Sequence, residues 1–217
     1  MSIHHKYIKY AGFAGLAGAI LVGCAEFLIQ FNAHGGYSWD NYDYFMAVSP
    51  ARLTLGYYLG VFAAPLYIVG YWYLERLLEP GGRRASAAFF LLGAYAFAVG
   101  AIWLGERAFL AFTVQAIGEH AAAPDLLNQM SMLNEPLAIA LRVMMMLVSV
   151  IWILQVAKGR TALPRWMALV NPAFLLAAIF GLYAAAPSIG VYVMPIAMNV
   201  THAIIFGLAL ATQKPSP

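Results

Sequence analysis

The apolar run from Ala85 to Ile117 constrains the fold of this chain most, because it carries Gly105-Glu106-Arg107 near its far end. A transmembrane helix needs about 20 mostly apolar residues, and this run is longer. An ionisable side chain inside a membrane span is costly unless it is paired or hydrated. Because adjacent residues of a helix point in different directions, Glu106 and Arg107 cannot satisfy each other. Their partners are therefore expected on other helices.

The composition places the whole chain in the membrane. Of its 217 residues, 63% are hydrophobic and 10% are charged, whereas soluble domains have about 25% charged residues. We therefore predict an all-α polytopic membrane protein, with one transmembrane domain covering residues 1–217. The net charge of +3 comes from basic residues in short loops between apolar runs. Such residues indicate topology, and no nucleic-acid partner is predicted.

Six apolar runs predict a bundle of six transmembrane helices. The expected spans are approximately 8–31, 53–78, 85–117, 135–157, 166–186 and 192–212. Asn134-Glu135-Pro136 is typical of a helix start, with Asn as the cap and Pro in the first turn, and Glu135 as a partner for the helix dipole. Asn171-Pro172 marks either a kink in the fifth span or a later start of its helix.

The basic residues of the loops predict the orientation. With six spans, both termini lie on one side, and nine lysines and arginines fall on that side against Arg52 on the other. The nine are Lys6, Lys9, Arg76, Arg83, Arg84, Lys158, Arg160, Arg165 and Lys214. Because positive residues favour the cytoplasmic side, we expect a protein of the cytoplasmic (inner) membrane with both termini in the cytoplasm.

The first span carries a stripe of small residues. Ala11, Gly15, Ala19 and Gly23 recur every four positions, a spacing that lets a second helix approach closely. Glu26 lies three residues beyond Gly23, on the same side of the helix. It is therefore expected to face protein and not lipid.

The same span contains the only cysteine of the chain, Cys24. Leu21-Val22-Gly23-Cys24, after a basic start and an apolar run, resembles a bacterial lipoprotein signal that is cleaved before a lipid-bearing cysteine. Four-residue matches are common in spans rich in Gly and Ala, so a membrane-embedded thiol is the favoured interpretation.

The segment between the first two spans is rich in aromatic and acidic residues, from Gly35 to Tyr44. Trp and Tyr favour the headgroup layer, so an interfacial belt is the first interpretation. The segment is also long enough to fold over a cavity mouth as a lid, which is the alternative.

The ionisable groups within the spans share one depth. A rise of about 1.5 Å per residue places Glu26 about 27 Å from the inner surface and Arg142 about 10 Å below the outer surface. Glu106, Asn199 and His202 also fall in the outer half. We therefore predict a polar pocket between spans one, three, four and six, lined by Glu26, Glu106, Arg107, Arg142, Asn199 and His202.

This pocket has two interpretations, one structural and one functional. Glu26 and Glu106 could pair with Arg142 and Arg107 to hold the bundle together. Alternatively, the pocket opens outward and binds an amphipathic or lipidic ligand, or the polar part of a partner transmembrane helix. The arginines would then hold an anionic head group, while the glutamates and His202 would tune it or donate hydrogen bonds.

Two other functions stay open at this point. One is an acid-base enzyme on a lipid or isoprenoid substrate, with Glu26 or Glu106 as general acid and His202 as base. The other is a small proton-coupled transporter, which would need a polar pathway through the inner half. Glu26, Glu106 and His202 could supply metal ligands, but no His-x-x-x-His or Cys-x-x-Cys spacing is present, so no metal and no cofactor are predicted.

The stretch from Gly56-Tyr57-Tyr58-Leu59-Gly60 through Pro65 to Gly70-Tyr71-Trp72 resembles a family of small bacterial six-span membrane proteins, a domain of unknown function. The resemblance extends through the first three spans, with an acid late in the first span, as Glu26 is here. Relatives tend to have a histidine near the position of Glu106 and Arg107, which this chain lacks. The resemblance implies fold and topology, and no activity.

Overall fold

The computed structural model describes residues 3–33, 42–120, 123 and 125–213, and within these ranges all regular structure is helical. In chain order the elements are α1 (Ile3–Gln30), η1 (Asp43–Ala47), α2 (Pro50–Leu78), η2 (Glu79–Gly81), α3 (Arg83–Gly118), α4 (Asp125–Ala157), η3 (Arg165–Leu169), α5 (Pro172–Ala185), α6 (Pro187–Val193), η4 (Met194–Ile196) and α7 (Ala197–Thr212). Residues 35–41 of the aromatic segment and Lys214 of the charge count lie outside the described ranges.

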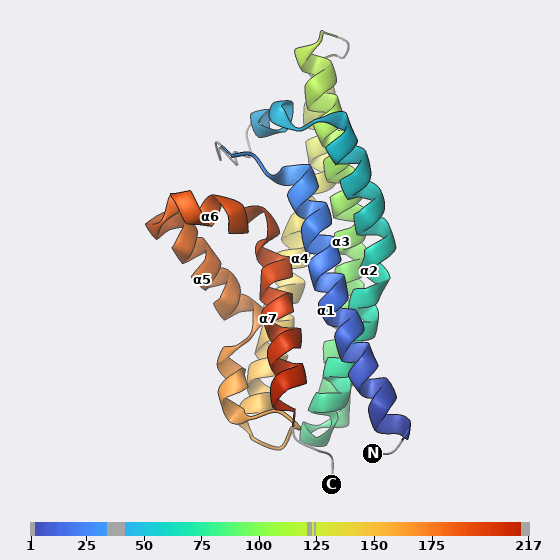
Figure 1. Ribbon diagram of the computed structural model, residues 1–217, viewed down its shortest axis with the longest axis vertical. Helices are drawn as coiled ribbons and strands as arrows, with labels where there is room; N and C mark the ends of the chain where they lie inside the picture. The colour runs from blue at the N-terminus through green and yellow to red at the C-terminus, as the bar shows by residue number, and fades with distance from the viewer. Residues whose placement is uncertain (1–2, 34–41, 121–122, 124, 214–217) are drawn as a thin grey trace.

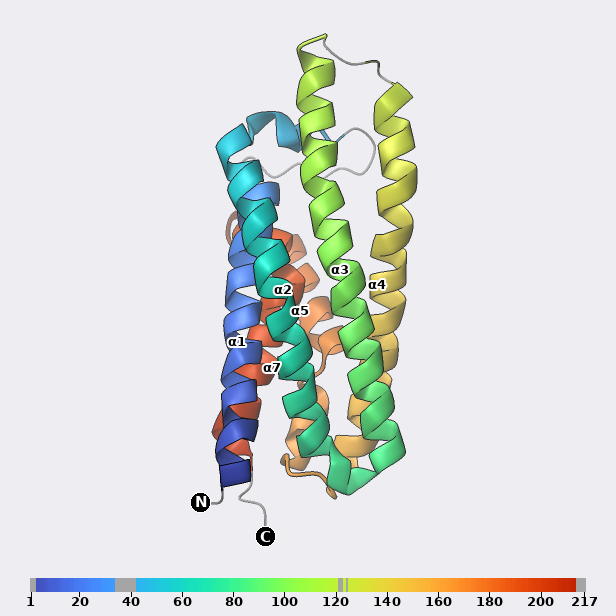
Figure 2. The same ribbon diagram turned by 90° about the vertical axis from the view of Figure 1, so that its right-hand side faces the viewer.

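α1, α2, α3, α4 and α7 run along the long axis of the molecule, and α5 and α6 form a hairpin beside them (Figure 1). α1 packs against α2 and α7, α2 packs against α3, and α3 packs against α4. The two termini lie at the same end of the bundle as the turn between α2 and α3 (Figures 1 and 2). α5 runs away from the end that holds the termini, α6 leads back toward the bundle, and α7 returns to that end (Figure 1).

Within the described residues, five helical segments are long and apolar enough to cross a membrane. They are Tyr7–Gln30, Pro50–Gly81, Arg83–Gly118, Asp125–Ala157 and Pro187–Thr212. The predicted span 166–186 is shorter in the structure, where α5 begins only at Pro172 and has 14 residues. At 1.5 Å per residue α5 measures about 21 Å, less than the roughly 30 Å of a hydrocarbon core.

The local chemistry explains why α5 starts late. Arg165–Leu169 form the separate 3-10 helix η3. Asn171 is the N-cap of α5, because its side chain accepts a hydrogen bond from the backbone N–H of Phe174 at 3.1 Å. Asn171-Pro172 is therefore a helix start, which decides between the two alternatives that the sequence left open.

The predicted start of the fourth span at Asn134-Glu135-Pro136 is wrong. α4 begins at Asp125, and Pro136 lies inside it. The side chain of Asn134 is buried and donates a hydrogen bond to the carbonyl oxygen of Trp103 on α3, at 3.1 Å. The side chain of Asn134 therefore bonds to α3 and does not cap a helix, and α4 continues through this position.

The small-residue stripe of α1 packs as predicted, because Ala11, Gly15, Ala19 and Gly23 are all buried. The closest approach is to α2, where a Cβ atom at Gly15 would lie 2.6 Å from the Cα of Gly70. Backbone atoms cannot move aside cheaply, so only glycine fits at this crossing.

We expect Gly15→Ala to lower the melting temperature of the purified protein, by about 5 °C, because overpacking costs about 1–3 kcal/mol. Gly207→Ala on α7 is the matched control, since a Cβ there meets no atom within 4 Å. That control should raise the melting temperature slightly, because alanine favours helix over glycine. Equal melting temperatures for the two variants would contradict this packing.

Candidate functional site

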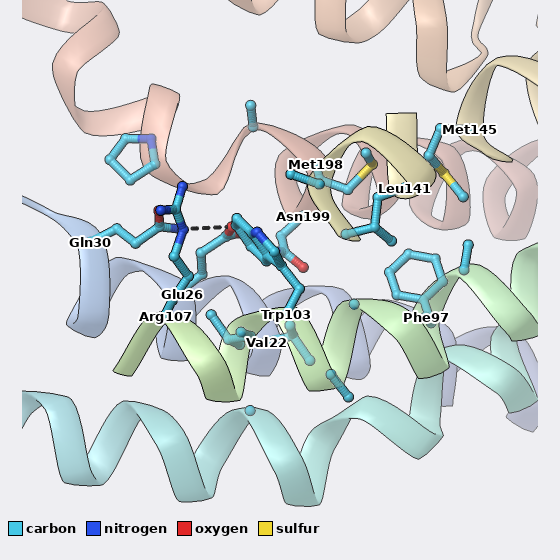
Figure 3. A pocket seen from close by; sticks show the side chains of 18 of the residues that line it. Val22, Glu26, Gln30, Phe97, Trp103, Arg107, Leu141, Met145, Met198 and Asn199 are labelled. Atoms are coloured by element: carbon cyan, nitrogen blue, oxygen red, sulfur yellow. Dashed lines mark hydrogen bonds between the residues drawn. The ribbon is translucent and has the colours of Figure 1, made fainter. Parts of the chain in front are cut away.

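A cavity of about 290 Å³ lies among the helices, lined by residues from α1, α2, α3, α4, α5 and α7 and from η1 and η4. Its polar lining side chains are Glu26, Gln30, Tyr44, Tyr67, Trp103, Arg107, Arg142 and Asn199. Figure 3 shows Gln30, Glu26 and Arg107 gathered at one end, and Phe97 and Met145 at the other. The cavity therefore has a polar end and an apolar end.

Glu26 is the acidic residue of the polar end. Its carboxylate accepts hydrogen bonds from the side-chain amides of Gln30, at 2.9 Å, and Asn199, at 2.5 Å. The Asn199 carbonyl oxygen in turn accepts a hydrogen bond from the Tyr67 hydroxyl at 2.6 Å. α1, α2 and α7 are thus joined by one buried chain of hydrogen bonds.

The sequence positions these groups by spacing and by size. Gln30 follows Glu26 by one helical turn, so the two side chains share one face of α1. Gly23 makes room for α7, because a Cβ there would lie 3.1 Å from the Cβ of Asn199. The prediction that Glu26 faces protein is confirmed, since its side chain is buried.

Arg107 is the buried cation of the polar end, with 3% of its surface exposed. Its guanidinium lies 3.5 Å from the carboxylate of Glu135 on α4. The guanidinium carbon also lies 5.3 Å from the ring centroid of Tyr42 and 5.1 Å from that of Trp103, distances typical of cation-π contacts. Arg107 therefore forms its ion pair with Glu135, which was predicted only as a helix-dipole partner.

The strap, which we define as residues 42–48, contacts the polar end of the site. Its Tyr42 donates a hydrogen bond from its hydroxyl to Glu135 at 2.5 Å, and its Tyr44 lines the cavity. The side chain of Gln115 on α3 donates to the carbonyl oxygens of Phe45 and Val48 at 3.0 and 2.6 Å. The described part of the aromatic segment therefore contributes to the site.

Tyr42 is held in an unusual state. Its backbone has φ 57° and ψ 25°, the left-handed region that a bulky side chain rarely adopts. Burial, and then the hydrogen bond to Glu135, raise the pKa of the Tyr42 hydroxyl above its ordinary value. Because the folded pKa is raised, this hydroxyl stays a donor, and the contact is lost only when the pH rises above the ordinary tyrosine range.

The structure separates the six residues that the sequence grouped. Glu26, Arg107, Arg142 and Asn199 line one cavity, and the side chain of Arg142 is exposed. Glu106 is half-buried outside the cavity lining and accepts a hydrogen bond from Asn134 at 3.4 Å.

His202 is fully buried and also does not line the cavity. Its Nδ1 lies 2.8 Å from the carbonyl oxygen of Met198, so Nδ1 carries the proton and donates. Its Nε2 lies 2.8 Å from the Tyr71 hydroxyl and accepts from it when the ring is neutral. Both ring nitrogens are therefore engaged within the core.

Gln30, Tyr67 and Trp103 were not predicted to belong to the site. Tyr42 and Tyr44 belong to the segment for which a lid was the alternative prediction, and Glu135 was predicted only as a helix-dipole partner. Gln30 could have been found from its spacing of four from Glu26. The indole N–H of Trp103 is buried and has no hydrogen-bond partner among the described residues. Within the same residues, no three His, Cys, Asp or Glu side chains are close enough to hold a metal ion.

We expect Tyr42→Phe to loosen the strap without disturbing the helices, because it removes one hydrogen bond to a carboxylate. Amide hydrogen exchange at Phe45 and Val48 should become about tenfold faster. Tyr95→Phe is the control, since Tyr95 is exposed on α3. Identical exchange at the strap in both variants would show that the Tyr42 hydroxyl does not hold it.

The comparisons with known proteins identify a family and no activity. No curated protein and no solved structure matches this chain. A family model, described as a family of unknown function (DUF6796), matches residues 1–214. This agrees with the resemblance noted from the sequence, and the chain belongs to this family of unknown function.

Proposed function

We propose that this membrane protein binds a small amphipathic ligand, with one acyl or isoprenoid-like chain and an anionic head group, in the cavity among its helices. The observation that carries this proposal is the division of one cavity into a polar and an apolar end (Figure 3). Ligand sites of this kind are mostly apolar, with a few placed polar groups that fix orientation.

The charges at the polar end favour an anion. Two cationic side chains, Arg107 and Arg142, line the cavity against one acidic side chain, Glu26. Arg107 is already fixed by Glu135 and two aromatic rings, so its position is set before a ligand arrives. Arg142 is exposed, and it lines the same cavity from α4.

The apolar end of the cavity and its volume restrict the rest of the ligand. The apolar end is lined by Phe97, Leu141, Met145 and Met198. Each CH₂ group of a ligand buried there contributes about 0.8 kcal/mol to the free energy of binding. A volume of about 290 Å³ lies at the lower limit of typical ligand sites, roughly 300–1,000 Å³. This size supports a single chain over a two-chain lipid, and over a partner helix about 10 Å across.

The membrane placement is part of this proposal. The termini share one end of the bundle with the turn between α2 and α3, and nine of the ten loop lysines and arginines were assigned to that end from the sequence. The positive-inside rule then puts that end in the cytoplasm of an inner membrane. Counting the short α5 as a partial crossing gives six passes, and the cavity opens in the outer half.

The acid-base enzyme has less support. It needs His202 beside a substrate, but His202 does not line the cavity and both its nitrogens are engaged. Glu106 also stands outside the cavity lining. Only Glu26 among the catalytic candidates faces the space that a substrate would occupy.

The proton-coupled transporter also has less support. It needs polar lining that continues toward the cytoplasmic end. Beyond Tyr67, the cavity is lined there by Ala96, Phe97 and Met145, and Tyr67 stacks on Phe97 with ring centroids 3.6 Å apart.

The test is retention of palmitate, with hexadecanol as the uncharged comparison, by the purified protein in native mass spectrometry. Wild type should retain palmitate more strongly. Arg142→Ala should weaken the binding of palmitate about 10- to 100-fold and leave the binding of hexadecanol unchanged, because it removes a charged contact to the head group. Arg160→Ala, at an exposed arginine outside the cavity lining, is its control.

A second variant tests the apolar end. Gly100 lines the cavity, and a Cβ there meets only Leu141, at 3.7 Å, so Gly100→Leu fills space without clashing at its first atom. Gly100→Leu should weaken the retention of both probes. Gly181→Leu is its control, because a Cβ there meets no atom within 4 Å, and it should change the retention of neither probe. Equal retention of both probes by wild type and every variant would refute the proposal.

A further inference from the structure

A second cavity, of about 540 Å³, lies between the start of α3 and the last turns of α4. Gly81, Gly82, Arg83, Arg84 and Ala85 line one side, and Ile151, Leu154, Gln155 and Lys158 line the other. No residue belongs to both cavities. The turn between α2 and α3, which lines this cavity, lies at the end of the bundle that holds the two termini (Figure 2).

We propose that this cavity binds the phosphate head group of an anionic phospholipid. Three cations line it, Arg83, Arg84 and Lys158, and no acidic residue does. The carboxylate of Glu79, which does not line the cavity, lies 2.9 Å from Arg76 and 4.0 Å from Arg83. Among the described residues, Arg84 and Lys158 form no ion pair, so their charges are available to a phosphate.

The shape of this cavity is fixed by a contact between a buried side chain and the backbone. Gln155 is 4% exposed, and its amide donates a hydrogen bond to the carbonyl oxygen of Gly82 at 3.1 Å. Gly82 has φ 153°, in the region where a side chain would be strained. α4 thereby fixes the turn that carries Arg83 and Arg84.

The start of α3 adds to the attraction. Gly82 is its N-cap and supplies no side-chain hydrogen bond to the first turn. The first backbone N–H groups of a helix carry partial positive charge and favour phosphate. This contribution supplements that of the three cationic side chains.

The apolar wall distinguishes a lipid from a free phosphate ion. Leu154 and Ile151 lie four and seven residues before Lys158, on the same face of α4, and Leu154 is 56% exposed. A phosphate at Lys158 would place its acyl chains along these two side chains, toward the bilayer interior. Basic pockets of this kind at the cytoplasmic ends of transmembrane helices suit anionic lipids.

The test uses the full-length protein in nanodiscs of phosphatidylcholine with phosphatidylglycerol as the minor component. Native mass spectrometry after release counts the phosphatidylglycerol retained per protein. Wild type should retain phosphatidylglycerol in preference to phosphatidylcholine. Arg84→Gln with Lys158→Gln should weaken retention about 30-fold, from about 1 kcal/mol for each cation near the membrane surface. Lys158→Gln alone, expected to lose about fivefold, serves if the double variant does not assemble.

The controls separate this site from general surface charge, from free phosphate and from the first cavity. Lys9→Gln with Arg160→Gln removes two cations outside the cavity lining and should retain phosphatidylglycerol as wild type does. Inorganic phosphate should not displace the lipid. Equal loss in both double variants, or displacement by inorganic phosphate, would overturn the proposal. Arg142→Ala should leave this retention unchanged, so this site can fail or succeed independently of the proposed function.

Discussion

The buried carboxyl of Glu26 and the two amides that bond to it are the contact on which the polar interior depends. A carboxyl inside a bundle of apolar helices is costly unless its oxygens are engaged. Gln30 supplies one donor from the same helix, and Asn199 supplies the other from α7. Because Tyr67 of α2 bonds to Asn199, the requirement of one side chain fixes three helices relative to each other. The glycine contacts of α1 permit that approach, and the polar contacts select its register.

Arg107 is the second polar centre, and it lies at the same end of the cavity as Glu26 (Figure 3). Its partner Glu135 is also the acceptor for Tyr42, so α3, α4 and the strap meet at one carboxylate. This arrangement explains why α4 stays helical through Pro136, since Asn134 and Glu135 are both used in contacts outside their own helix. The two centres together form the polar end of the cavity to which we assign ligand binding.

Much of the architecture could be predicted from the sequence, and the reasons are local. Apolar run length identified the long helices, and the spacing of Ala11, Gly15, Ala19 and Gly23 identified the buried face of α1. Depth counting brought Glu26, Arg107, Arg142 and Asn199 together. The hydrogen-bond and ion-pair partners of these side chains could not be predicted, because they depend on how each helix is rotated and on contacts between residues far apart in the sequence. Counting along a helix gives the height of Glu106 or His202, and not which side of the bundle each one faces. Tyr42 lies in the segment that was predicted to be a belt or a lid, but its bond to Glu135 could not be predicted, because it joins residues far apart in the sequence.

The most direct test of this account is a double-mutant cycle on the contact between α1 and α7. Glu26→Leu and Asn199→Leu, singly and together, would be compared by their free energies of unfolding in mixed micelles. Each single variant leaves a buried polar group without its partner, and the double variant removes both groups. The double variant should be less destabilised than the sum of the two single variants by about 0.5–3 kcal/mol. Additive effects within about 0.5 kcal/mol would mean that the two side chains do not meet, and the polar end of the cavity would lose its basis.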